Sequence, residues 1–250
     1  MNFAFMDKYY PYFLKGAGIT IVLSFFAVLI GTILGFLLTL LRRTNIKPIR
    51  AILDLLNINF TNGKNPFTRF IIKIVDGNPI RFLANAYVEF MRGTPLLVQI
   101  YIIYIGVPSL LGIDFPDMIV AVIALCLNSA AYVSEIIRAG IEAVDKGQAE
   151  AARSLGMNGR LTMLYIIVPQ AFKNVLPALG NEFIAIIKDS SMVSVIGVAE
   201  LMYNANTVRG SIALGLEPVI VAAAIYFIIT FTLTRILGYV ERRMKASDIR

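Results

Sequence analysis

Long apolar runs separated by polar connections follow one another along most of the chain. Each run is close to or above the roughly 20 residues that a helix needs to cross the hydrocarbon layer of a membrane. Because several such runs occur within 250 residues, the pattern predicts an all-α, polytopic membrane helical bundle of about five spans, in a single domain that covers residues 1–250. The predicted spans are residues 16–41, 95–111, 118–140, 175–202 and 218–240.

Local signals refine three of these runs. The first run is too long for the core of a signal peptide, so we expect a true span. At the second run, Thr94 offers a hydroxyl N-cap and Pro95 suits the first helical position. The fourth run is interrupted by residues 188–191. This interruption indicates either unwound backbone beside a cavity or a loop at the outer surface that leads to a half-helix.

Residues 44–81 form a long polar connection that contains two short apolar stretches, 49–56 and 67–75. Each stretch is too short to cross a bilayer. We therefore expect two amphipathic helices, joined by a turn at 62–66, that lie on the cytoplasmic interface or against a partner. The pair Gly63-Lys64 is not a phosphate-binding loop, since the other positions of that motif are missing.

The distribution of Lys and Arg predicts how the chain is oriented. The connections after the first, third and fifth runs hold seventeen of these residues, whereas the amino end and the other connections hold only Lys8, Lys15 and Arg209. Cytoplasmic connections are enriched in Lys and Arg. The amino end is therefore expected outside and the carboxyl end in the cytoplasm, which an odd number of spans satisfies.

Composition supports a membrane protein and excludes several other classes. The chain is 58% hydrophobic and only 16% charged, with a mean hydropathy of +0.74, which is too apolar for a soluble exterior. The net charge of +7 is explained by the cytoplasmic connections, so no nucleic-acid partner is expected. With a single cysteine, Cys126, and no histidine, neither an intrachain disulfide nor a histidine-based metal site is expected.

The connection 141–173, predicted to be cytoplasmic, carries the most informative motif. Residues 147–156 are typical of a short helix with small side chains on one side, a carboxylate, Glu150, near its amino end, and Gly156 placed for a left-handed cap. Such a helix lets the backbone of another protein come close. The side chains expected to face that partner are Ala149, Ala151, Ala152 and Leu155.

This spacing resembles the coupling loop of ABC importer permeases. Val168 stands where the family usually has Leu and keeps an apolar contact. Three further stretches, 87–99, 128–135 and 176–191, look like the branch that takes up polar amino acids such as histidine, glutamine, arginine and cystine. Segment 44–81 is longer than the family's usual connection, so its role stays open. The matching residues of the loop are Glu150, Ala151, Ala152, Gly156, Ile166 and Pro169.

The resemblance implies a permease with a type I-like fold in a bacterial cytoplasmic membrane. Such a subunit forms the translocation path and works with a second permease subunit, identical or paralogous, with cytoplasmic ATPases and with an external solute-binding protein. ATP and Mg²⁺ would be bound by the ATPase, and no catalytic residue, cofactor or metal is expected in this chain. The ATPase would contact Glu150, Ala151, Ala152, Gly156 and Pro169.

Polar residues inside the predicted spans are candidates for the solute path, because such groups are costly at membrane depth. Asn128, Tyr132 and Glu135 follow an i, i+4, i+7 pattern that places them on one stripe of the third span. Interhelical hydrogen bonds that only pack the bundle are the alternative explanation. The complete candidate set is Gln99, Asn128, Tyr132, Glu135, Asn181 and Glu182, which offers groups for an amino acid's ammonium and carboxylate.

Two functions from other classes remain open at this point. An intramembrane enzyme would use Glu135 and Asp189 as an acid and base pair, and a passive channel would need no ATPase. Neither explains the coupling motif. The identity of the amino acid, and whether the two permease subunits are identical, are also left open by the sequence.

Overall fold

The computed structural model describes residues 3–44, 78–212 and 215–246, and these are almost entirely helical, with no strand among them. The amphipathic helices predicted at 49–56 and 67–75 lie outside the described residues. The helices are α1 (Met6–Arg43), α4 (Pro79–Gly93), α5 (Leu96–Tyr101), α6 (Val107–Leu111), α7 (Asp117–Glu142), α8 (Lys146–Ser154), α9 (Gly159–Thr162), α10 (Val168–Asp189), α11 (Leu201–Ser211) and α12 (Glu217–Ala246).

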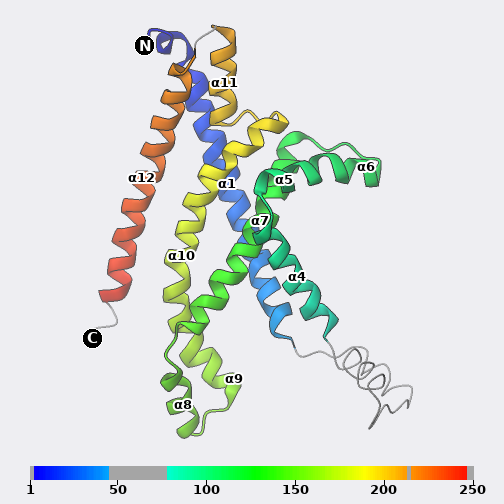
Figure 1. Cartoon of the computed structure of the whole chain (residues 1–250). Helices are drawn as coiled ribbons and strands as arrows, with labels where there is room; N and C mark the ends of the chain where they lie inside the picture. Colours follow the sequence, from blue (N-terminus) through cyan, green and yellow to red (C-terminus); the bar gives the residue numbers. More distant parts are fainter. Residues whose placement is uncertain (1–2, 45–77, 213–214, 247–250) are drawn as a thin grey trace.

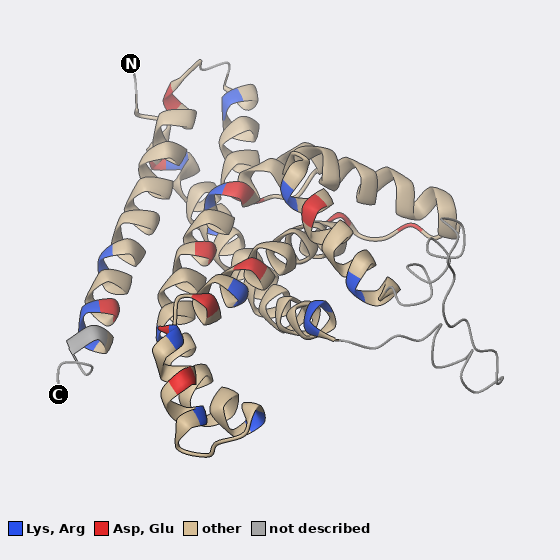
Figure 2. Ribbon diagram, turned by 60° about the horizontal axis from the view of Figure 1, so that its bottom comes forward, with Lys and Arg blue, Asp and Glu red and all other residues tan. Residues whose placement is uncertain are grey.

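Three helices are long and apolar enough to cross a membrane: α1, α7 and α12. Figure 2 shows that most of the helical surface carries neither a basic nor an acidic residue. The helices α4 and α5–α6 together pass the same test but are bent by 114° at the break between them, so up to four spans are found among the described residues. The fourth predicted span, 175–202, corresponds in part to α10, whose 22 residues include Glu182 and Lys188 and fall short of this apolarity.

The third and fifth predicted spans agree with α7 and α12 to within a few residues at most ends, although α12 continues beyond residue 240. The first span, α1, begins at Met6 and not at residue 16. Figure 1 shows α1 at the centre of the molecule, with α11 and the amino end at one end of the bundle and α8, α9 and the carboxyl end at the other.

The second predicted span needs correction. Thr94 does not cap the helix, because its hydroxyl donates back to the Phe90 carbonyl at 2.8 Å. Pro95 is the residue before the helix and has extended backbone, so α5 begins at Leu96. Upstream, Asn78 caps α4 by accepting from the Arg81 amide at 3.0 Å, and Pro79 opens that helix. Pro95 separates α4 from α5, because the residue before a proline, here Thr94, avoids helical backbone.

The fourth apolar run is interrupted as predicted, and the interrupting segment is itself helical. α10 begins at Val168, earlier than residue 175, and ends at Asp189, after which Ser190–Ile196 form a 3₁₀ helix. Gly197 then takes a left-handed conformation with φ of 94°, and α11 follows. Val193 and Ile196 are buried in the main core. The interruption is therefore neither unwound backbone nor a loop at the surface, because it is a partly buried 3₁₀ helix that leads to the separate short helix α11.

The core forms where α1 crosses α7. Leu23 and Ala27 of α1 pack with Ala124 and Leu125 of α7 and with Ile100 of α5. Close approach depends on Gly35, where a Cβ would lie 2.8 Å from the Ala130 carbonyl oxygen. Small residues at helix crossings are the usual means of close packing in membranes. This packing holds the ends of α1, α4 and α7 together.

Candidate functional site

The predicted coupling motif forms a helical hairpin from α8 to the start of α10. Asp145 caps α8 by accepting from the Gly147 amide at 2.7 Å. At the other end Gly156 has φ of 85°, and its amide donates to the Arg153 carbonyl at 2.9 Å. The Met157 amide donates to the Ala152 carbonyl at 3.0 Å, which completes a Schellman cap. The predicted left-handed glycine is confirmed.

The faces of α8 differ in part from the prediction. Ala152 is buried, at 4% exposure, and Ala149 packs against the cluster of Val144, Ile167 and Ala171. The expectation that Ala152 faces a partner is therefore wrong, because residues 149 and 152 lie three apart on the inner side of the helix. Glu150, Ala151 and Pro169 are exposed, and Leu155 is 85% exposed.

A polar pocket of about 460 Å³ separates the base of α8 from α10. Gln170 bridges the two helices by donating to Gln148 at 3.3 Å, and it also donates to the Ile166 carbonyl at 3.0 Å. The hairpin is thus held to α10 both by the apolar cluster and by this amide pair. The remaining lining residues are Ala143, Val144, Asp145, Lys173 and Asn174.

Among the pathway candidates, Gln99 and Asn128 are packing groups in this conformation. Gln99 is 2% exposed, and its amide donates to the carbonyls of Met91 at 2.8 Å and of Thr94 at 3.0 Å. Asn128 on α7 donates to the Gln99 carbonyl oxygen at 2.9 Å. These bonds satisfy the carbonyls that the bend between α4 and α5 leaves free. For Gln99 and Asn128, the structure thus shows the interhelical hydrogen bond that was the alternative to a role in the solute path.

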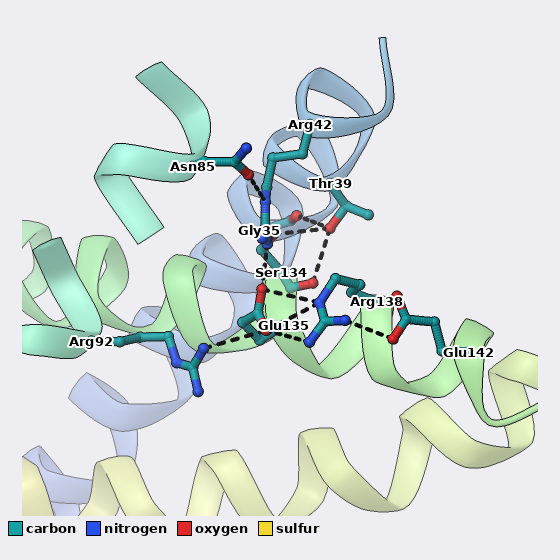
Figure 3. A network of polar contacts seen from close by, with 9 residues as sticks. All are labelled: Gly35, Thr39, Arg42, Asn85, Arg92, Ser134, Glu135, Arg138 and Glu142. Carbon is teal, nitrogen blue, oxygen red and sulfur yellow. Dashed lines mark hydrogen bonds and ion pairs between the residues drawn. The ribbon is translucent and has the colours of Figure 1, made fainter. Parts of the chain in front are cut away.

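Glu135 lies at the centre of a network of arginines (Figure 3). It accepts from Arg42 of α1 at 2.5 Å and from Arg138 of its own helix at 2.9 Å, and it pairs with Arg92 of α4 at 3.3 Å. Arg138 also binds Glu142 at 2.6 Å. The carboxylate therefore joins three helices, and its charge is already compensated within the chain.

Of the remaining candidates, Tyr132 lies beside this network, whereas the other two lie on α10. Tyr132 is 38% exposed, with the Arg92 guanidinium 5.7 Å from its ring centre. Asn181 is exposed and Glu182 is half-buried, both on α10. The stripe predicted on α7 thus divides: Asn128 points to α5, whereas Tyr132 and Glu135 point to arginines of other helices.

Residues that the sequence interpretation missed include the partners of Glu135 and a buried acid at the opposite end of the bundle. Glu200 is fully buried, where it accepts from the Tyr226 hydroxyl at 2.5 Å and from the Tyr203 amide at 2.7 Å. Arg138 could have been found from its i+3 position relative to Glu135. The contact of Glu200 with the Tyr203 amide is also local, since Glu200 is the N-cap of α11. The contacts of Glu135 with Arg42 and Arg92, and that of Glu200 with Tyr226, join residues far apart in sequence, and no local pattern indicates them.

A family model described as binding-protein-dependent transport system inner membrane component matches residues 70–246. The chain belongs to this family. This permease is 40% identical over 238 residues to the arginine transport system permease protein ArtQ of Bacillus subtilis (strain 168), with 95% of this chain and 94% of that protein covered. It is 36% identical over 245 residues to the putative glutamine transport system permease protein GlnP of Rickettsia conorii, with 97% and 98% covered.

Solved structures agree with this assignment. The permease matches a chain from a crystal structure of an amino acid ABC transporter with histidines, with a TM-score of 0.82, 43% identity, and 97% of this chain and 99% of that chain covered. An inward-facing MetNI methionine ABC transporter matches with a TM-score of 0.70 at 14% identity over 98% and 99% of the two chains, which supports the fold alone. The resemblance to ABC importer permeases is confirmed, and this chain is a membrane-embedded transport subunit.

Proposed function

We propose that this permease imports amino acids and that α8 and α9 dock on a separate cytoplasmic ATPase. The observation that carries the proposal is the exposed surface of α8, where Glu150, Ala151 and Leu155 project from a helix closed by the left-handed Gly156. An exposed apolar side chain on a small-residue helix suits a groove in a partner. The names of the similar proteins, which refer to arginine, glutamine and an amino acid transporter with histidines, support amino acids as substrates.

The hairpin can pass a movement of the ATPase to the membrane because it is fastened to α10. Ala149 packs in the cluster that contains Ile167, Ala152 is buried, and Gln148 is bonded to Gln170. Since packed helices move as units, a push on α8 would shift α10. In the proposed mechanism this movement opens the path first to one side of the membrane and then to the other. The full assembly would include a second permease subunit and a solute-binding protein.

Glu182 is the candidate that we assign to the solute's ammonium group. It lies half-buried on α10, the helix that the hairpin would move. In vesicles with the whole transporter, Glu182→Gln is expected to raise the half-saturation constant for uptake by about tenfold, since one charge-assisted hydrogen bond is lost. Glu89→Gln, which removes an exposed carboxylate of α4, is the matched control.

Uptake should also stop when ATP is withheld. Uptake that continues without ATP would favour a passive channel. A Glu182→Gln variant that is made in lower yield but keeps the wild-type half-saturation constant would show a structural role and would reject this assignment.

An intramembrane acid and base pair of Glu135 and Asp189 is disfavoured because Glu135 is bound by three arginines.

The proposed orientation puts the amino end outside and the hairpin in the cytoplasm. In a Cys126→Ser background, Asp114→Cys is expected to react with a membrane-impermeant thiol reagent in intact cells, whereas Ser154→Cys is expected to react only after the cells are opened. Both positions are exposed, and Cys126 is buried. The side of the membrane on which each residue lies, and not its burial within the protein, therefore decides whether it reacts. The opposite labelling pattern would reverse the proposed topology.

A further inference from the structure

A basic pocket of about 190 Å³ lies where the end of α1, the start of α4 and the end of α7 meet. It adjoins the Glu135 network, with which it shares Arg42 and Arg138. Neither the proposed solute path nor the proposed ATPase dock uses it. Its lining residues are Thr39, Arg42, Arg43, Arg81, Asn85, Arg138 and Glu142.

The pocket has an excess of positive charge. Two of its four guanidinium groups, Arg42 and Arg138, are compensated by Glu135 and Glu142. The other two, Arg43 and Arg81, are exposed and form no ion pair with any residue that the structure describes. Among the described residues, about two positive charges are thus left without a carboxylate, which favours an anionic ligand.

Hydrogen-bond donors also outnumber acceptors among the side chains that line this pocket. The Asn85 carbonyl oxygen accepts from Arg42 Nε at 2.7 Å, which fixes the amide so that its NH₂ group remains for another acceptor. Arg42 is held by Glu135, and its side chain is only 19% exposed. Groups fixed in this way lose little freedom on binding. The pocket is therefore a prepared site for a ligand with several acceptor oxygens.

Guanidinium groups match phosphate because their planar fork bonds two oxygens at once. The surroundings also favour a ligand with an apolar part, since Phe82 and Leu83 follow Arg81 and are 71% and 67% exposed. Basic pockets at the ends of spans, beside an apolar surface, suit the headgroups of anionic lipids. We propose that this pocket binds a phosphate group, with an anionic phospholipid or free inorganic phosphate as the source.

The experiment measures lipid retained by the full-length transporter, isolated with its accompanying subunits. After incubation with equal amounts of phosphatidylglycerol and phosphatidylcholine, native mass spectrometry counts the bound molecules of each. The wild type is expected to retain phosphatidylglycerol in excess. Arg43→Gln with Arg81→Gln should lower this retention by about tenfold or more, because two charge-assisted contacts are removed. A parallel thermal-shift titration with inorganic phosphate tests the soluble source.

The control is Arg242→Gln with Arg243→Gln, which removes the same charge from exposed positions of α12. If it leaves retention unchanged, the loss in the pocket variant supports the site, with a lipid as source. Stabilisation by inorganic phosphate that the pocket variant loses, without preference for phosphatidylglycerol, supports the site with a soluble source. Equal retention of both lipids by the wild type, together with no response to phosphate, would overturn the proposal. So would a pocket variant that behaves as the wild type in both assays.

Discussion

Gly156→Ala is expected to weaken the association of the permease with its ATPase by roughly five- to thirtyfold. Gly156 has φ of 85°, a conformation that costs an L-residue with a side chain about 1 to 2 kcal/mol. Nothing lies within 4 Å of the added Cβ, so the strain is in the backbone and not in packing. The loop should leave its native shape, and Leu155 should move with it. Copurification of the ATPase and the rate of stimulated ATP hydrolysis measure the effect.

Gly159→Ala is the matched control in the same hairpin. This glycine also has open space around its Cβ position, and its φ is not positive. Alanine favours the helical conformation there, so α9 should be unchanged or slightly more stable. Membrane insertion should be normal in both variants. Full coupling in Gly156→Ala, or equal losses in the two variants, would show that the left-handed cap is not what presents α8 to the ATPase.

The coupling hairpin could be predicted in detail because its signals are local. A helix of small residues and a glycine at the left-handed position act within about ten residues, and so does the Asp145 cap, which was not among the predictions made from the sequence. The exception is Ala152, which was expected to face a partner and is buried. Small size alone suits close approach by any neighbour, whether the neighbour belongs to the same chain or to a partner. The sequence pattern could not tell an internal contact from an external one.

The spans were predictable to the extent that they are apolar and uninterrupted. α7 and α12 match their apolar runs, whereas the second run turned out to be one arm of a bent pair with α4. The bend depends on Gln99, whose amide reaches carbonyls of Met91 and Thr94. Such a long-range polar contact leaves no periodic signal in the sequence. The start of α4 was readable from Asn78 and Pro79, but it falls within the segment first taken as an insertion.

The candidate solute path shows the limit of helical spacing as evidence. Asn128, Tyr132 and Glu135 do lie on α7 at the predicted intervals, yet their partners differ. Asn128 meets Gln99, whereas Glu135 meets Arg42 and Arg92 from helices distant in sequence. Spacing along one helix predicts which residues share a face. It does not predict which other helix covers that face, and that covering helix decides whether a polar group binds solute or packs the bundle.

Glu135→Gln is expected to lower the thermal stability of the permease by roughly 6 to 12 °C, since about 3 kcal/mol or more is lost when one partner of a buried charge network is removed. The Glu135 side chain is 15% exposed, and that of Arg42 is 19% exposed. Solvent screens Arg42 only weakly, whereas the side chains of Arg92 and Arg138 are 45% and 43% exposed. The lower end of the range for buried pairs therefore applies. Thermal unfolding of the purified protein, followed by loss of the monodisperse species, measures the change.

Glu142→Gln is the matched control, because the same chemical change is made about two helical turns further along α7. The Glu142 side chain is 59% exposed and pairs with Arg138, and an exposed i, i+4 pair of this kind contributes about 0.3 to 0.5 kcal/mol. A shift of about 2 °C or less is expected. If Glu135 instead held the ammonium group of the solute, Glu135→Gln would keep the stability of Glu142→Gln and raise the half-saturation constant for uptake. Measuring both quantities on the same preparations therefore separates a charge that joins three helices from one that binds the cargo.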